Sequence, residues 1–175
     1  MYMLIYTDRL SLRTFTSSDY KSMNRLLGSR AVMKSSVEGP LTASQIKEWL
    51  EKQINVYRAD QGLGALAVIH KEHQILIGYC GLFRAPCMVG LNEIAIGYRF
   101  IQNHWGKGFA TEASIAVREY AFITLGLPRL VALIEPSNPR SIRVAEKIGM
   151  TFEKEVMLET YDHPDYLYSL ENPYK

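Results

Sequence analysis

The sequence predicts a mixed α/β fold, and three kinds of observation point to it. Several short runs are apolar on both faces, which is typical of central strands covered by helices on either side. Longer amphipathic segments begin at residues that cap helices and end at glycine or proline. The composition, with 47% hydrophobic and 22% charged residues, is that of a folded globular protein. Because no repeat, low-complexity tract or linker interrupts the chain, we expect one domain over residues 1–175.

The first elements are a strand and two helices. Residues 10–14 alternate between apolar and polar side chains, which predicts a half-buried strand. Ser17 or Ser18 can cap a short helix that follows. A capping box beginning at Thr42 opens a longer helix with apolar residues at helical spacing, which ends near Gly62.

The rest of the chain alternates strands with two further helices. In order, we expect strands at 65–69, 75–83 and 93–100, a helix from Gly108, a strand at 130–134, a helix from Pro139, and strands at 151–159 and 166–170. Gly126 and Pro128 stop the first of these helices. Asn138 caps the second, with Pro139 at its first position, where a missing N–H costs nothing.

Charge and composition exclude several classes of partner. The net charge of +2 and the lack of a basic run argue against nucleic acid, and no stretch approaches a membrane span. Cys80 and Cys87 have no metal or redox spacing, so we expect a reducing cytoplasm. His70, His73 and His163 are scattered along the chain, so we expect no metal site.

A glycine-rich turn, Trp105-Gly106-Lys107-Gly108, lies between a strand and a long helix. Small residues let a backbone approach an anion, the first helical N–H groups have no intrahelical partner, and Lys107 adds a positive charge. A diphosphate therefore fits the site. The turn lacks the Ser or Thr after Gly-Lys of a Walker loop, and Thr111 stands where a dinucleotide fingerprint has its third glycine. The alternative is a tight turn whose glycines serve packing alone.

Two motifs in order carry a resemblance to a known family. Ile96-Gly97-Tyr98-Arg99-Phe100 and the following His104 to Ala113 resemble the acetyl-CoA motif of the GNAT acetyltransferase superfamily, and more narrowly its RimJ/RimL branch. Asn138 to Met150 resembles the helix that follows in that branch. The resemblance implies a twisted, mostly antiparallel sheet of about six to seven strands with helices on both faces, and acetyl-CoA as the co-substrate.

The resemblance also implies how the cofactor is held. Backbone N–H groups of one segment would cradle the CoA pyrophosphate: Gly106, Lys107, Gly108, Phe109, Ala110 and Thr111. Backbone groups of Tyr98, Arg99 and Phe100 would pair with the pantetheine arm, and Asn138 would hydrogen-bond the cofactor. Trp105 stands where the family pattern has Gln or Arg.

Two residues are candidates for catalysis. Ser141 can protonate the leaving thiolate, although it can equally be an ordinary first-turn helix serine. Glu93 is the candidate general base, and its alternative is a solvated carboxylate at a strand end.

The acceptor is predicted to be a primary amine. An α-amine with a pKa of about 8 costs under about 1 kcal/mol to deprotonate, whereas a lysine or polyamine amine near 10.4 costs about 4 kcal/mol. A peptide or protein N-terminal α-amine is therefore favoured. A small-molecule acetyltransferase for an amino sugar, antibiotic or polyamine is one alternative, and a non-catalytic acyl-CoA-binding module is another. The protein is expected to be a monomer or a homodimer.

Overall fold

The computed structural model describes residues 3–36, 38–60, 62–86, 93–158 and 162–175. The first half of the described chain holds β1 (Met3–Tyr6), β2 (Leu10–Arg13), α1 (Tyr20–Leu27), α2 (Ala43–Ala59), β3 (Gly64–His70) and β4 (Ile75–Arg84). The second half holds β5 (Ile94–Phe100), α3 (Phe109–Glu119), β6 (Arg129–Ile134), α4 (Pro139–Lys147), β7 (Thr151–Met157) and β8 (Pro164–Glu171). The expected elements occur in the expected order, and one further strand, β1, precedes them. Cys87 and Glu159 lie outside the described residues.

The described residues form a single sheet of eight strands in the order β1-β2-β3-β4-β5-β6-β8-β7. Neighbouring strands are antiparallel except β5 and β6, which are parallel. The sheet has one strand more than the six to seven expected, because the apolar start of the chain forms β1. This strand pairs with β2, with Tyr6 opposite Ser11.

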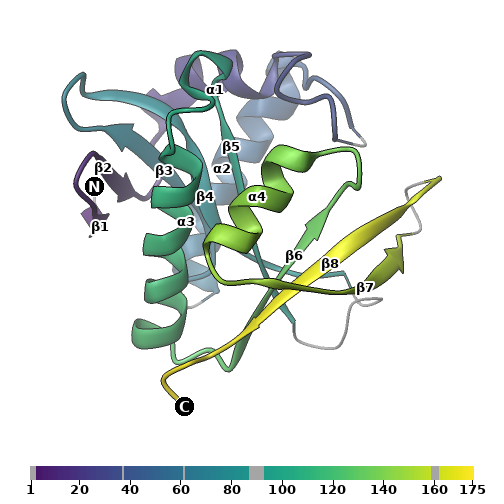
Figure 1. The fold of residues 1–175 in the computed structure, drawn as a ribbon. Coiled ribbons are helices and arrows are strands. Elements are labelled where there is room, and N and C mark those ends of the chain that lie inside the picture. Colours follow the sequence, from purple (N-terminus) through teal and green to yellow (C-terminus); the bar gives the residue numbers. More distant parts are fainter. Residues whose placement is uncertain (1–2, 37, 61, 87–92, 159–161) are drawn as a thin grey trace.

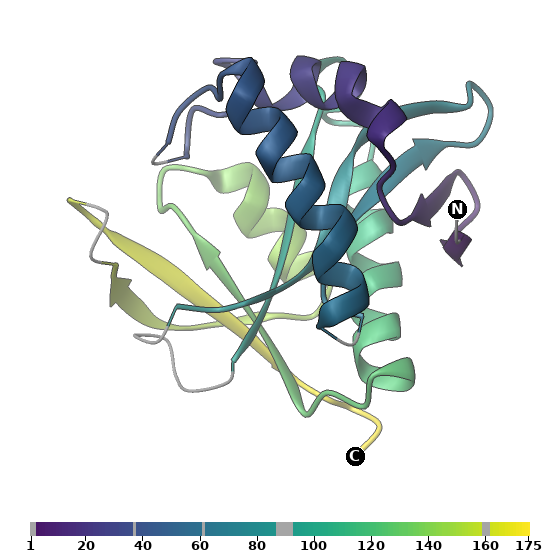
Figure 2. The same ribbon diagram turned by 180° about the vertical axis from the view of Figure 1, so that it is seen from behind.

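Helices cover both faces of the sheet, as Figures 1 and 2 show: α3 and α4 on one face, α1 and α2 on the other. Strand β3 contributes side chains to the cores on both faces of the sheet. Its Leu66 and Val68 belong to the core under α3, whereas Ala65, Ala67 and Ile69 belong to the core under α1 and α2. Because successive side chains of a strand point to opposite faces, a central strand between two helical layers is apolar throughout.

Helix α3 ends in a single π-helical turn, Tyr120–Thr124. Gly126 follows with a positive φ of +62°, a backbone conformation in which a helix ends, as expected from the sequence. Among the described residues, none of the helices combines the length and the hydropathy that crossing a bilayer requires.

Candidate active site

Strands β5 and β6 part at their carboxyl ends. Their only parallel pair among the described residues is Ala95 with Val131, whereas β4 and β5 stay in register from Arg84–Ile94 to Gly78–Phe100. Figure 1 shows β5 and β6 diverging towards their carboxyl ends, with α4 in front of them. The glycine turn follows β5, and Asn138 follows β6. Both sequence motifs therefore lie at the end of the sheet where β5 and β6 diverge, which we call the open end.

The backbone of β5 turns alternate residues towards this open edge. The Ile101 N–H donates to Ile77 O at 2.8 Å, which directs odd-numbered residues of the strand at β4. The N–H and C=O of Tyr98 and Phe100 therefore face the side that β6 leaves. The expectation that Arg99 joins them does not hold for its backbone, which pairs with Tyr79 of β4.

The glycine turn has the conformation of an anion site. Gly106 and Gly108 have φ values of +74° and +83°, which strain any residue with a Cβ. A Cβ at Gly106 would meet no described atom within 4 Å, so crowding does not require that glycine. The first intrahelical bond runs from the Glu112 N–H to Gly108 O at 3.0 Å. The preceding N–H groups, those of residues 109–111, thus lie outside the helical ladder.

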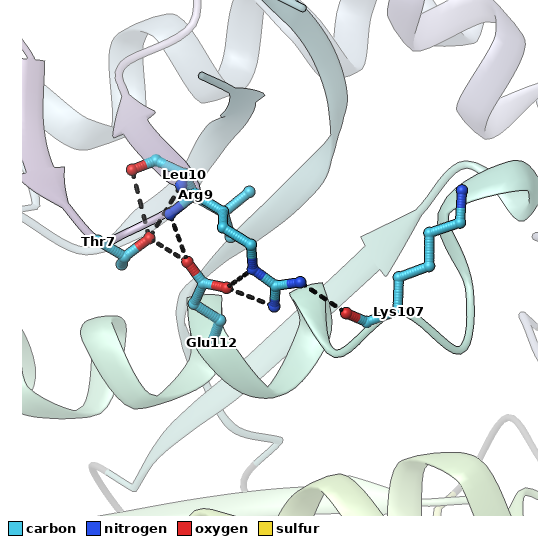
Figure 3. A network of polar contacts seen from close by, with 5 residues as sticks. All are labelled: Thr7, Arg9, Leu10, Lys107 and Glu112. Atoms are coloured by element: carbon cyan, nitrogen blue, oxygen red, sulfur yellow. Dashed lines mark hydrogen bonds and ion pairs between the residues drawn. The ribbon is translucent and has the colours of Figure 1, made fainter. Parts of the chain in front are cut away.

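A polar network from the β1–β2 turn holds the glycine turn (Figure 3). Arg9 donates from Nη1 to Lys107 O at 2.9 Å and from Nε to Glu112 Oε2 at 2.7 Å. The other oxygen of Glu112 accepts from Thr7 Oγ1 at 2.6 Å and from the Arg9 N–H at 2.9 Å. Figure 3 shows the Lys107 side chain extending away from this network, so its ammonium stays available to a ligand. The network fixes the backbone of the turn without using its exposed face.

Trp105 connects the glycine turn to the strand before it. Its indole Nε1 donates to Phe100 O at 2.7 Å, and the Arg140 guanidinium lies 5.3 Å from the ring centroid. These contacts give a structural reason for tryptophan at a position where the family pattern has Gln or Arg.

Ser141 and Tyr98 meet across the open end. The Tyr98 hydroxyl donates to Ser141 Oγ at 3.3 Å, and Asn138 Oδ1 accepts from the Ser141 N–H at 3.2 Å. Burial raises the pKa of Tyr98 to about 12, so its hydroxyl keeps its proton and remains a donor. Asn138 Oδ1 caps α4, and the Nδ2 group of the same amide is a hydrogen-bond donor. From the sequence, only the backbone of Tyr98 was expected in the site, and the place of its side chain was not predicted.

Glu93 lies at the other end of β5. Its carboxylate is 3.3 Å from Arg129 Nε, and Arg129 also pairs with Glu153 and Glu171. Tyr98 is five residues along the strand, about 16 Å away at the usual rise of a strand. This distance and the ion pair argue against the general-base role expected for Glu93 and favour a role in joining β5 to β6, β7 and β8.

An acidic group at the carboxyl end of β6 was also missed. Glu135 directly follows β6, and the pairing of Ile134 with Tyr166 brings it next to Asp165 of β8. Asp165 is 5% exposed, and its Oδ1 has no hydrogen bond to the described residues, although His163 Nδ1 is 3.7 Å away. Burial raises the pKa of Asp165, and the charge of Glu135 adds to this while that of His163 opposes it. Glu135 and Asp165 are 30 positions apart in sequence, so no local motif predicts that they lie together.

Comparison with known proteins places this geometry among acetyltransferases. Residues 9–151 match the family model described as an acetyltransferase (GNAT) domain. The uncharacterised N-acetyltransferase p20 of Bacillus licheniformis is 33% identical over 159 residues, which are 90% of this chain and 86% of that protein.

Solved structures agree with this match. A GNAT-family acetyltransferase from Bacillus anthracis is similar over 97% of this chain and 99% of its own, with a TM-score of 0.85 and 27% identity. The spermidine N-acetyltransferase of Vibrio cholerae, solved with CoA and spermine, covers 95% of this chain and 97% of its own, with a TM-score of 0.76. Its identity of 19% makes it similar in fold alone.

Proposed function

The chain belongs to the GNAT acetyltransferase family, and on this premise we propose that it moves the acetyl group of acetyl-CoA directly to a primary amine. One observation carries this proposal: β5 and β6 diverge at their carboxyl ends, where the glycine turn follows β5 and the cap of α4 follows β6. A site of this form accepts an extended thioester between two strands and an anion at a helix N-terminus. The proposal treats the chain as one catalytic domain of the RimJ/RimL-like branch.

The cofactor would be held mainly by backbone. N–H groups of residues 106–111 and the ammonium of Lys107 would bind the pyrophosphate, because they converge where the helix dipole is positive. Tyr98 would offer backbone groups to the pantetheine arm, and Phe100 would offer its N–H, since its carbonyl oxygen accepts from Trp105. Asn138 would donate from Nδ2. All of these groups flank the same open end.

The chemistry needs a polarised carbonyl and a proton for the sulfur. The Tyr98 N–H, on the open edge of β5, can donate to the thioester oxygen as charge develops there. The attacking amine loses one proton and the leaving thiolate gains one, so proton transfer balances. Ser141 would give its hydroxyl proton to the sulfur and regain, through solvent, the proton that the amine releases. The hydrogen bond that Ser141 accepts from Tyr98 turns the serine proton away from the tyrosine.

The acceptor that we favour is a peptide or protein N-terminal α-amine. Its pKa of about 8 means that a weak base suffices. Asp165 supports this choice, because it has an oxygen without a hydrogen bond to the described residues and its raised pKa makes it a better proton acceptor than an ordinary aspartate.

A small cationic amine is the second candidate, and the pairing of Asp165 with Glu135 favours it. Two neighbouring carboxylates attract a polyamine or amino sugar more strongly than a neutral α-amine. Glu135 is, however, already engaged, since hydrogen bonds from Ser137 and Ser35 lower its pKa more than burial raises it.

A competition experiment separates the two acceptors. The enzyme and acetyl-CoA are incubated with equimolar Ser-starting and Ala-starting peptides, an N-terminally blocked lysine peptide and spermidine, and acetylation is followed by mass shift. We expect the free α-amines to react first. Faster acetylation of spermidine or of the lysine side chain would refute the α-amine proposal while leaving acetyl transfer intact.

A further inference from the structure

Three possible metal ligands, His70, Glu72 and His73, lie together in the turn between β3 and β4. His70 ends β3, and the turn closes through a hydrogen bond from the Gln74 N–H to His70 O at 2.8 Å. The rings of His70 and His73 stack with centroids 4.7 Å apart. With Glu72 they offer one ligand atom each, all within 4.8 Å of one another. The expectation that these histidines are scattered is therefore wrong for His70 and His73.

We propose that this cluster of His70, Glu72 and His73 binds one divalent transition-metal ion of the Zn²⁺, Ni²⁺ or Cu²⁺ type. Two imidazoles and one carboxylate suit these borderline ions, whereas Mg²⁺ and Ca²⁺ prefer a shell of oxygen atoms. Three protein ligands also leave a coordination position open to water. Because Glu72 and His73 are exposed and His70 is half-buried, an ion reaches the site directly from solvent.

The ligand atoms need only a small rearrangement. With metal–nitrogen distances near 2.0–2.1 Å, ligands of a tetrahedral ion lie about 3.3 Å from one another. Rotation of the exposed Glu72 and His73 side chains closes the remaining gap. The His73 N–H now donates to His70 Nδ1 at 3.4 Å, a long hydrogen bond. Ligation through Nε2 requires the proton on Nδ1, so binding the ion replaces this weak contact.

The cluster adjoins the glycine turn. The His70 ring packs edge-on against Phe109, the first residue of α3, with centroids 5.1 Å apart. The ring of His104, just before the turn, lies 6.1 Å from the Phe109 ring, centroid to centroid. His104 has a buried Nδ1 with no hydrogen bond to the described residues. A bound ion would thus add positive charge beside the segment that we assign to the pyrophosphate.

The test is a calorimetric titration of the full chain, freed of any histidine tag, with ZnCl₂ and separately with NiCl₂. We expect one equivalent of ion per chain, and His73→Gln and Glu72→Gln to weaken binding about tenfold or more. The matched control is His163→Gln, just before β8, which should bind as the unmodified chain does. MgCl₂ should give no binding at the same concentrations.

A second measurement locates the ion. Paramagnetic Ni²⁺ should broaden the ring resonances of His70 and His73 and spare those of His163. Binding that survives His73→Gln unchanged, or no binding of Zn²⁺ and Ni²⁺ at all, would overturn the proposal. Thermal unfolding of each variant should show a transition like that of the unmodified chain, which checks that the fold is kept. None of these readouts uses acetyl transfer, so their failure would leave the proposed function untouched.

Discussion

Replacing Glu112 by glutamine disturbs a carboxylate that four donor groups surround: the Thr7 hydroxyl and the N–H, Nε and Nη2 of Arg9. Glutamine keeps the shape of the side chain but removes the charge and turns one oxygen into a donor that faces donors. A hydrogen bond to a charged group contributes about 1.5–3 kcal/mol, whereas an exposed ion pair contributes about 0–1 kcal/mol. The Arg9 side chain is 47% exposed and that of Glu112 is 17% exposed. We therefore expect Glu112→Gln to lower the free energy of unfolding by about 2 kcal/mol.

The same change should weaken CoA binding, because Arg9 also holds Lys107 O. A loss of about 1 kcal/mol corresponds to roughly fivefold in affinity, and kcat should change less, since Ser141 and Tyr98 are not in the network. Denaturant unfolding measures the first effect and calorimetry the second. The control is Glu48→Gln on α2, where the glutamate is exposed. If both variants unfold and bind CoA alike, the proposed role of the network is wrong.

The pH dependence gives an independent readout of Glu112. Burial raises its pKa, but hydrogen bonds from Thr7 and Arg9 more than offset this, so the pKa lies below its ordinary value. The ionised carboxylate therefore stabilises the fold above the pKa of the unfolded chain, about 4.3. This contribution is lost as the pH falls through the lower folded pKa. In acid unfolding, the free energy of unfolding of Glu112→Gln should therefore fall less steeply with decreasing pH than that of the unmodified chain.

Other substitutions test the remaining parts of the site. Gly108→Glu puts a negative charge and a strained φ at the proposed pyrophosphate position and should lower CoA affinity about 100-fold, or about 3 kcal/mol, by calorimetry; Gly126→Glu, with a similar positive φ at the far end of α3, should leave it unchanged. Ser141→Ala should lower kcat about 10- to 100-fold with little change in the KM for acetyl-CoA, and an unchanged kcat would remove its catalytic role. Asp165→Asn should lower kcat/KM for the amine about 10-fold or more and flatten the acid limb of its pH profile. Glu93→Gln should instead leave kcat/KM unchanged and cost about 1 kcal/mol of stability, and the reverse pattern would restore Glu93 as the base.

Much of the fold could be predicted from the sequence because its signals are local. Helix caps, turn glycines and apolar periodicity act over a few residues, and they located α2, α3, α4 and the central strands. Strand β1 was missed because four residues are too short for a clear alternation. The side of β5 to which Arg99 turns its backbone depends on the register with β4, which no local pattern records.

By itself, the sequence determined the glycine turn, the cap at Asn138 and the family to which they belong. Their chemistry follows from φ angles and unpaired N–H groups that neighbouring residues fix. Only the tertiary structure decided which side chains meet. The Arg9 network spans about a hundred residues, Tyr98 meets Ser141 from another element, and Glu93 is drawn to Arg129 instead of the open end. The physical reason is that such contacts depend on strand order and on where β5 and β6 part, and these are properties of the whole sheet.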